Sequence, residues 1–217
     1  MLSDQQLINR LTQAQVKHLV HQDGQQWVLF EDQEYFWLTL NTVVQSIMAK
    51  AAPAQLIFNY HRQLVKHLPK QFNSMIELGL GGGSLIRYLL QQNSRLDYTC
   101  VELSPLAIDW FSQYFNPAGH PINLIQGDAA TQLAQLPSAE VLLCDLFSDF
   151  GSPACLFELD FHRLCQTKFT HTMIINLLPR TMEELSQVVR LCQQVGIAPS
   201  QVIKLENMRN HLIILQK

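Results

Sequence analysis

The sequence predicts an α/β fold with a doubly wound, mostly parallel sheet whose last strand is reversed. Strand-like and helix-like segments alternate from residue 74 onward, and this alternation is typical of a parallel sheet with helices on both faces. A glycine-rich segment, 79–83, separates the first strand of the series from its first helix. The last two strand-like segments, 201–205 and 211–215, are joined only by residues 206–210, so they must form an antiparallel hairpin. We therefore expect a Rossmann-like sheet.

Apolar periodicity defines the individual elements of this sheet. The expected strands are 74–78, 98–102, 123–126, 141–145 and 172–176, followed by the terminal hairpin. The expected helices are 84–92, 105–115, 154–165 and 182–195. A further helix, 54–67, is expected to begin after Pro53, because proline is favoured at the first helical position.

The first 52 residues have a different pattern. Residues 3–15 have helical apolar spacing, and three short strand-like segments follow at 17–20, 27–30 and 36–40. The sequence therefore predicts a small N-terminal helix and β-strand unit at 1–52 and a Rossmann-like domain at 53–217.

Composition limits the possible partners. The chain has 217 residues, of which 47% are hydrophobic and only 15% are charged, so part of its surface is expected to be covered by a second copy in a homodimer. The net charge of -3 and the scattered basic residues argue against nucleic acid. Residues 1–6 do not resemble a signal peptide, and no apolar run is long enough to span a membrane. We expect a cytoplasmic protein.

The cysteines and histidines show no spacing typical of a metal site, so no metal is expected. Five cysteines without a C-x-x-C pair lie mostly in apolar segments, and we expect reduced core thiols. They are Cys100, Cys144, Cys155, Cys165 and Cys192. The sequence also lacks the G-x-S-x-G motif of many hydrolases.

The glycine-rich segment indicates a nucleoside-binding loop. Glycine allows backbone groups to approach a ligand closely at the start of a helix. Glu102 ends the next expected strand, where a carboxylate can accept hydrogen bonds from both ribose hydroxyls. The alternatives are a tight turn for the loop and a solvent-facing carboxylate for Glu102. A dinucleotide such as NAD would fit the same two features.

The segment Glu77-Leu-Gly79-Leu-Gly81-Gly82-Gly83 resembles motif I of class I S-adenosylmethionine (SAM) methyltransferases. Asp128 and Ala129, which follow the third expected strand, resemble the Gly-Asp-Ala site where these proteins hold adenine. The resemblance implies that Asp128 accepts from the exocyclic amine, that the Ala129 amide donates to the ring, and that Leu103 provides an apolar wall. Asp128 is explained nearly as well as a cap of the next helix.

Two carboxylates follow the fourth expected strand. Asp145 and Asp149 come after the carboxyl end of the strand, where open α/β sheets bind ligands, and an acidic site suits an amine acceptor. Asp145 could orient the amine lone pair or act as a base. The structural alternatives are a turn cap for Asp145 and a water-facing side chain for Asp149.

From residue 27 to 215 the chain resembles the polyamine aminopropyltransferases, or spermidine synthases. The segment around Gln45 is similar to the segment that carries a ligand-contacting glutamine in that family, and Tyr60-His61 resembles its Tyr-His pair. Core packing explains Tyr60 and His61 equally well. Spermidine synthases carry an aspartate in the glycine loop that selects decarboxylated SAM, whereas this chain has Gly82 at that position. Arg62 also replaces the glutamate that usually follows the Tyr-His pair.

The resemblance implies a SAM-dependent transferase on a spermidine synthase-like scaffold. Methyl transfer from SAM to a small amine-bearing acceptor is the favoured reaction, because the selecting aspartate is missing at Gly82. The first alternative is aminopropyl transfer from decarboxylated SAM. The second alternative is a non-catalytic protein that binds SAM or another nucleoside.

Overall fold

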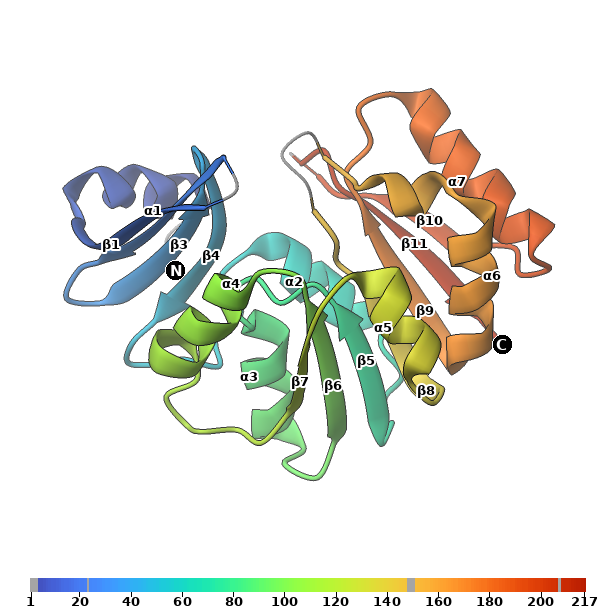
Figure 1. Cartoon of the computed structure of the whole chain (residues 1–217), viewed down its shortest axis with the longest axis horizontal. Coiled ribbons are helices and arrows are strands. Elements are labelled where there is room, and N and C mark those ends of the chain that lie inside the picture. Colours follow the sequence, from blue (N-terminus) through green and yellow to red (C-terminus); the bar gives the residue numbers. More distant parts are fainter. Residues whose placement is uncertain (1–3, 23, 148–150, 207) are drawn as a thin grey trace. The chain divides into compact units, whose positions relative to one another are not determined.

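The computed structural model describes residues 4–22, 24–147, 151–206 and 208–217. It contains two compact units, each formed by several stretches of the chain (Figure 1). The first unit contains Met1–Arg62, Gly81–Ser94 and Leu106–Pro121, and the second contains Gln63–Leu80, Arg95–Pro105 and Ile122–Lys217. The domain boundary expected between residues 52 and 53 stays a prediction.

The first unit contains a four-stranded antiparallel sheet in the order β1-β2-β3-β4. Its strands are β1 (Gln15–Gln22), β2 (Gln25–Glu31), β3 (Tyr35–Leu40) and β4 (Val43–Ala49). The first three were expected but are longer than predicted, and β4 was not expected as a strand. Helix α1 (Asp4–Arg10) precedes the sheet and is extended by a 3-10 turn at Leu11–Gln13. Leu7 of α1 belongs to a buried cluster with Trp37, Ile47 and Ala49 of the sheet.

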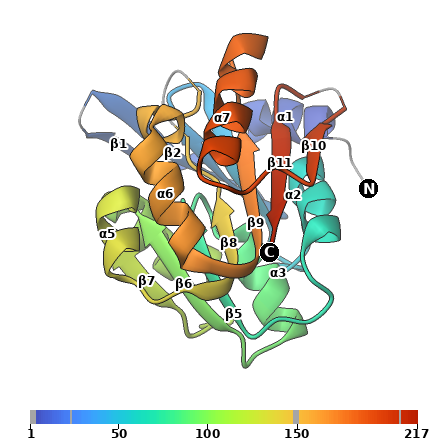
Figure 2. The ribbon, with the colours of Figure 1, turned by 90° about the vertical axis from the view of Figure 1, so that its right-hand side faces the viewer.

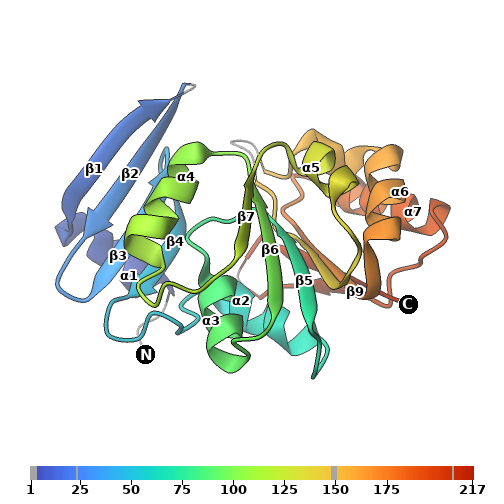
Figure 3. The ribbon, with the colours of Figure 1, turned by 60° about the horizontal axis from the view of Figure 1, so that its bottom comes forward.

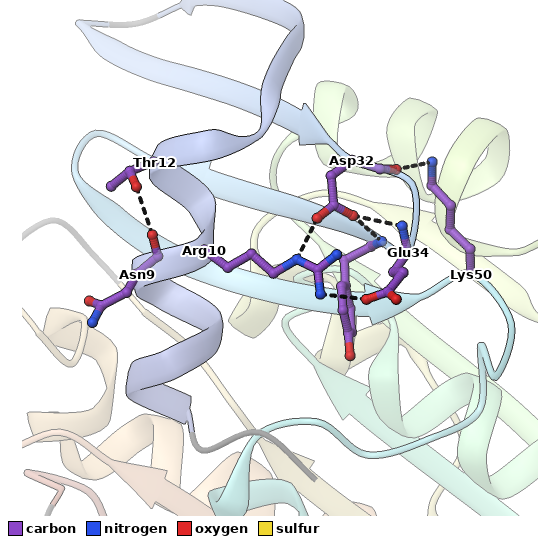
Figure 4. Close-up of polar contacts among 7 residues, drawn as sticks. Asn9, Arg10, Thr12, Asp32, Glu34 and Lys50 are labelled. Carbon is purple, nitrogen blue, oxygen red and sulfur yellow. Dashed lines mark hydrogen bonds and ion pairs between the residues drawn. The ribbon is translucent and has the colours of Figure 1, made fainter.

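Polar contacts connect α1 to the turn between β2 and β3 (Figure 4). Arg10 Nε donates to Asp32 Oδ2 at 2.6 Å, and the same guanidinium pairs with Glu34. Lys50 Nζ donates to the Asp32 carbonyl at 2.6 Å. Partly exposed ion pairs of this kind contribute little to stability individually, so we expect the buried apolar cluster to contribute most to holding α1 on the sheet.

The helix expected at 54–67 begins later than predicted. Residues 50–58 form turns, α2 spans Asn59–Leu64, and a 3-10 turn follows at Val65–His67. Arg62 explains the late start, because its Nη1 donates to the carbonyls of Leu56 (2.9 Å) and Ile57, which therefore need no helical amide.

Three further elements follow in the chain, between the first strands of a second sheet. Helix α3 (Ser84–Gln92) has the predicted bounds, and α4 (Pro105–Trp110) is continued by a π-helical turn at Phe111–Phe115. Both aromatic rings at the ends of this turn are buried. Such turns are frequent near functional sites.

The second unit contains a seven-stranded sheet in the order β10-β11-β9-β8-β5-β6-β7. Its strands are β5 (Ser74–Leu78), β6 (Asp97–Glu102), β7 (Asn123–Gln126), β8 (Ala139–Cys144), β9 (Phe169–Leu177), β10 (Gln201–Lys204) and β11 (His211–Gln216). Figure 3 shows the parallel strands β5, β6 and β7 next to one another. Strand β11 lies between β9 and β10 and is antiparallel to both (Figure 2). The predicted reversal of the last strand is confirmed.

Helices α5 (Ala129–Gln135), α6 (Leu159–Lys168) and α7 (Met182–Gln194) pack on one face of this sheet. A 3-10 turn at Ala154–Phe157 replaces the start of the helix predicted at 154–165. Alternate strand residues such as Ile76, Leu142 and Ile175 form one buried cluster with apolar residues of the three helices. Within the described residues, no helix is long and apolar enough to cross a bilayer.

Candidate functional site

The glycine loop begins at the carboxyl end of β5, and Gly79 is held close to the backbone of a neighbouring strand end. Its φ angle is +96°, and a Cβ atom there would lie 2.3 Å from the carbonyl oxygen of Asp145. The backbone at Asp145 is itself held in place, because its amide donates to the Leu78 carbonyl at 2.9 Å. Only glycine fits between these segments, so the ends of β5 and β8 meet without an intervening side chain.

Glu102, at the end of β6, is bonded to this loop. Its Oε2 accepts from the Leu80 amide at 2.9 Å, and its Oε1 accepts from the Ser104 amide at 2.7 Å. Burial raises the pKa of the Glu102 carboxyl, and the bonds from backbone amides oppose that rise. Glu102 is therefore not a purely solvent-facing carboxylate. Each of its oxygens has a second lone pair that could accept from a ribose hydroxyl.

Glu77 lies in β5 beneath the loop and is only 3% exposed. The Tyr98 hydroxyl on β6 donates to Glu77 Oε2 at 2.7 Å. Burial raises the pKa of Glu77 well above its usual value, and the neighbouring carboxylates of Asp145 and Glu102 raise it further. The hydrogen bond from Tyr98 acts in the opposite direction. The carboxylates of Asp145 and Glu102, after β8 and at the end of β6, therefore disfavour a negative charge on Glu77 near the end of β5.

Asp145 directly follows β8 and is partly buried. Its Oδ1 accepts from Asn176 Nδ2 at 2.7 Å, and Asn176 Oδ1 accepts from Asn210 Nδ2 at 3.0 Å. The predicted catalytic carboxylate therefore belongs to a side-chain network that extends across β9 to the connection between β10 and β11.

Asp128 caps α5, as its structural alternative proposed. Its Oδ1 accepts from the Thr131 amide at 2.9 Å and from the Thr131 hydroxyl at 2.8 Å, which lowers the pKa of the exposed carboxyl. Ala129 is the first residue of α5 and is partly buried, and Leu103 is 70% exposed after β6. These residues follow the same edge of the sheet as Glu102, but their role in holding adenine stays a prediction.

The rest of the glycine loop belongs to the first unit. A Cβ at Gly82 would lie 2.5 Å from Ser46 Oγ and 3.2 Å from Phe115 Cδ1, so a side chain at this position meets packed atoms. Gly81 has a φ of +52°, and a Cβ there would lie 3.9 Å from the Gln45 carbonyl oxygen, whereas a Cβ at Gly83 would collide with the Phe111 ring. The loop is therefore glycine-rich partly because β4 and the π-helical turn approach it closely.

Arg87 of α3 fixes this part of the loop. Its guanidinium is 1% exposed and donates to the carbonyls of Pro53 (2.6 Å), Phe115 (2.9 Å) and Gly82. Burial lowers the pKa of Arg87 to about 9, so the side chain is still charged at neutral pH.

The residues expected from the spermidine synthase resemblance lie in the first unit. Gln45 is partly buried on β4, and Tyr60 and His61 begin α2 with ring centroids 3.8 Å apart. Within the described residues, the buried His61 Nδ1 has no hydrogen-bond partner. Burial lowers the pKa of His61 to about 3, with smaller contributions from Arg87 and Arg62, so this imidazole is neutral. Ligand contact by these three residues stays a prediction.

One expected residue is not described, and three residues of the site were not expected. Asp149 lies outside the described residues, so its catalytic role stays a prediction. Tyr98, Asn176 and Asn210 were not expected at the site. A detectable signal did exist for Asn176, because it interrupts the apolar β9 at the position where Asp145 ends the neighbouring apolar β8.

Comparison with known proteins defines the fold. No family model and no curated protein matches the sequence. A probable spermidine synthase from Corynebacterium glutamicum is 17% identical, with a TM-score of 0.74 over 93% of this chain and 79% of its own. A spermidine synthase in complex with the transition state analogue AdoDATO is 15% identical, with a TM-score of 0.69 over 93% and 72%. Human methyltransferase-like protein 13 in complex with SAH is 21% identical, with a TM-score of 0.59 over 76% and 78%.

These similarities confirm the predicted architecture. The chain has the Rossmann-like fold of class I SAM methyltransferases. The spermidine synthases match this fold over 93% of the chain, so the fold is of the spermidine synthase-like form.

Proposed function

We propose that this chain is a SAM-dependent transferase and that it transfers a methyl group to a small amine-bearing acceptor. The observation that carries the proposal is the convergence of Glu77, Glu102 and Asp145 beside the loop at Gly79. Burial and mutual repulsion raise the pKa of Glu77, so the ligand-free arrangement disfavours its own negative charge. A cationic ligand relieves this repulsion.

The charge of the ligand separates SAM from a dinucleotide. SAM carries a positive sulfonium and an ammonium group, which suit a group of partly buried carboxylates. The pyrophosphate of NAD is anionic and would be repelled by Glu77 and Asp145. The adenosine part of both ligands could use Glu102 equally well.

The residues at the edge of the sheet fit the chemistry of methyl transfer. Bound SAM would supply an activated methyl group. Asp145 would accept a hydrogen bond from the acceptor amine and direct its lone pair at the methyl carbon. As the N–C bond forms and the C–S bond breaks, Asp145 would take the amine proton directly or pass it to water. Positioning is the main contribution that such a displacement requires.

Aminopropyl transfer from decarboxylated SAM is the second candidate. It is favoured by the spermidine synthases above, which match 93% of the chain, whereas the human methyltransferase matches 76%. It is disfavoured by Gly82, which carries no acid to select the decarboxylated ligand. Ser46 and Phe115 occupy the space that a side chain at position 82 would need. A protein that binds SAM without turnover is the third candidate.

Calorimetric titration with SAM, decarboxylated SAM, S-adenosylhomocysteine and NAD tests the proposal. We expect SAM to bind more tightly than S-adenosylhomocysteine, which lacks the sulfonium charge, and NAD to bind weakly or not at all. Preference for decarboxylated SAM would support aminopropyl transfer. Binding of NAD alone would contradict every SAM-based candidate.

A variant pair tests the residues of the site. Glu102→Gln should weaken all adenosine ligands by about tenfold or more, because a charge-assisted hydrogen bond to ribose becomes a neutral one. Glu158→Gln, a change at an exposed glutamate, is the matched control and should bind normally. A panel of small amines, assayed with SAM for methylated product, then separates an enzyme from a protein that only binds.

A further inference from the structure

Asn176 is a buried polar residue that the proposed chemistry leaves unexplained. It is 0% exposed in β9, and its neighbours Ile174, Ile175 and Leu177 are equally buried. A buried amide lowers stability unless its hydrogen bonds are made, and an apolar residue of similar size would satisfy the fold. The need for an amide at this position must therefore come from the groups that it contacts.

The register of the sheet places Asn176 beside Asp145. Cys144 of β8 pairs with Ile175 of β9, so the next residues of the two parallel strands, Asp145 and Asn176, are neighbours. The bond from Asn176 Nδ2 to Asp145 Oδ1 is 2.7 Å long. A donor at this distance stabilises the ionised carboxylate and restricts its rotation.

The Asn210 amide supports the orientation in which Asn176 donates to the carboxylate. Asn210 Nδ2 donates to Asn176 Oδ1 at 3.0 Å. With its oxygen engaged there, Asn176 presents its NH₂ group to Asp145 and cannot present the oxygen without losing both bonds. The connection between β10 and β11 therefore contributes to the geometry at the carboxyl end of β8.

We propose that Asn176 is a positioning residue that keeps Asp145 ionised and oriented toward the acceptor amine, and that Asn210 holds Asn176 in its donor orientation. The role of Asp145 toward the acceptor rests on the proposed function, whereas the effect of Asn176 on the Asp145 carboxyl does not. This arrangement suits an acceptor substrate whose amine carries a proton that Asp145 can remove or accept in a hydrogen bond.

Other ionisable groups around Asp145 act against its negative charge. Glu77 of β5, Tyr98 and Cys100 of β6 and Cys144 of β8 all interact electrostatically with Asp145. Each of these four groups, if ionised, is negative and disfavours a negative charge on Asp145. On the β11 side, His211 is buried, and its Nδ1 contacts the Arg209 carbonyl. The amide of Asn176 opposes the negative groups without adding a charge.

Titration of Asp145 in the ligand-free protein tests the proposal. The protein is labelled with ¹³C-carboxyl aspartate, and the Asp145 signal is assigned from Asp145→Asn. We expect Asn176→Leu to raise the Asp145 midpoint by about one pH unit, because a donor to the charged form is lost. Asn210→Ala should raise it by less, because Asn176 is retained. Asn123→Ala, which removes a strand asparagine bonded to Thr99 instead, should leave the midpoint unchanged.

An unchanged Asp145 midpoint in a folded Asn176→Leu protein would overturn the proposal. If that variant does not fold, Asn176→Ser and Asn210→Ala provide the same comparison, and unchanged midpoints in both would also overturn it. Once an acceptor is known, Asn176→Leu should lower kcat about tenfold or more and shift the acidic limb of the pH–rate profile to higher pH. The Kd for SAM should stay unchanged. Failure to find any methylated acceptor would count against methyl transfer. The Asp145 midpoint tests the effect of Asn176 on the Asp145 carboxyl whether or not an acceptor is found.

Discussion

The buried charges of the two units are neutralised in different ways. In the first unit, the Arg87 guanidinium is surrounded by backbone carbonyls of its own unit. In the second unit, Glu77 receives one hydroxyl bond and is repelled by Asp145 and Glu102. A charge whose hydrogen bonds are all made internally stabilises the fold, whereas carboxylates that repel one another store free energy that a cationic ligand can release. This difference separates a structural charge from a binding site.

Removal of the Arg87 charge should have the largest effect. Arg87→Met leaves three buried carbonyls without a donor, and we expect the free energy of unfolding to fall by about 3–5 kcal/mol. The free energy of unfolding of Arg87→Lys should lie between those of Arg87→Met and the wild type, because lysine keeps the charge but not the planar fork. Urea denaturation measures both effects. Arg163→Met, at an exposed ion pair, is the control and should change stability by less than about 0.5 kcal/mol. A similar loss in both Met variants would mean that Arg87 has no special structural role.

The second largest effect is expected from a side chain at Gly82, where the first unit packs tightly around the glycine loop. Gly82→Ala places a Cβ 2.5 Å from Ser46 Oγ and 2.7 Å from Ser46 Cβ, and we expect a loss of about 1–3 kcal/mol from overpacking. Ser46→Gly removes both atoms, so the double variant should be more stable than the sum of the single changes predicts. A double-mutant cycle by urea denaturation measures this coupling. Additive losses would show that the strain at position 82 has another source.

His61 gives the first unit a pH dependence. Its pKa is about 3 in the folded protein and about 6.5 when unfolded, so the unfolded chain binds an extra proton between these values. The contribution of neutral His61 to the free energy of unfolding is present above about pH 6.5 and is lost as the pH falls toward 3. The free energy of unfolding then falls by up to about 1.4 kcal/mol per pH unit. Urea denaturation from pH 7 to pH 5 measures the slope, and His61→Phe should make it shallower. Equal slopes in the two proteins would mean that His61 is not held neutral.

The sequence predicted the second unit better than the first for a physical reason. In the second unit, strands such as β5 and helices such as α7 have strong apolar periodicity and are followed by glycine, so their positions follow from local pattern. Strand β4 packs against a distant part of the chain, because Ser46 lies close to Gly82. The turns before α2 depend on side-chain bonds from Arg62 to nearby carbonyls, which apolar periodicity does not reveal.

The same distinction applies to the candidate site. Glu77, Gly79, Glu102 and Asp145 were identified because each follows or ends an apolar strand, and the topology brings these strand ends to one edge. Asn210 could not be found in this way, because its contact with Asn176 depends on the register of the terminal hairpin. The asparagine network is therefore a property of strand order, which a single sequence specifies only indirectly.

Removal of the Glu77 charge should have the smallest effect, and it tests the difference between the two units directly. Glu77→Gln keeps the shape of the side chain and an acceptor for the Tyr98 hydroxyl but removes the charge. Relief of repulsion should leave the free energy of unfolding unchanged or higher, the opposite of Arg87→Met. Affinity for SAM should fall about tenfold, or about 1.4 kcal/mol, because attraction to the sulfonium is lost.

Titration calorimetry with two ligands measures this charge effect. S-adenosylhomocysteine is a neutral thioether at the same position, so its affinity should change less than that of SAM, and the ratio of the two affinities should decrease. Glu158→Gln again serves as the exposed control. Equal losses for both ligands would mean that Glu77 acts through the shape of the loop, and the carboxylates would then be structural in the same sense as Arg87. A selective loss for SAM would show that the second unit uses its unbalanced charge for binding.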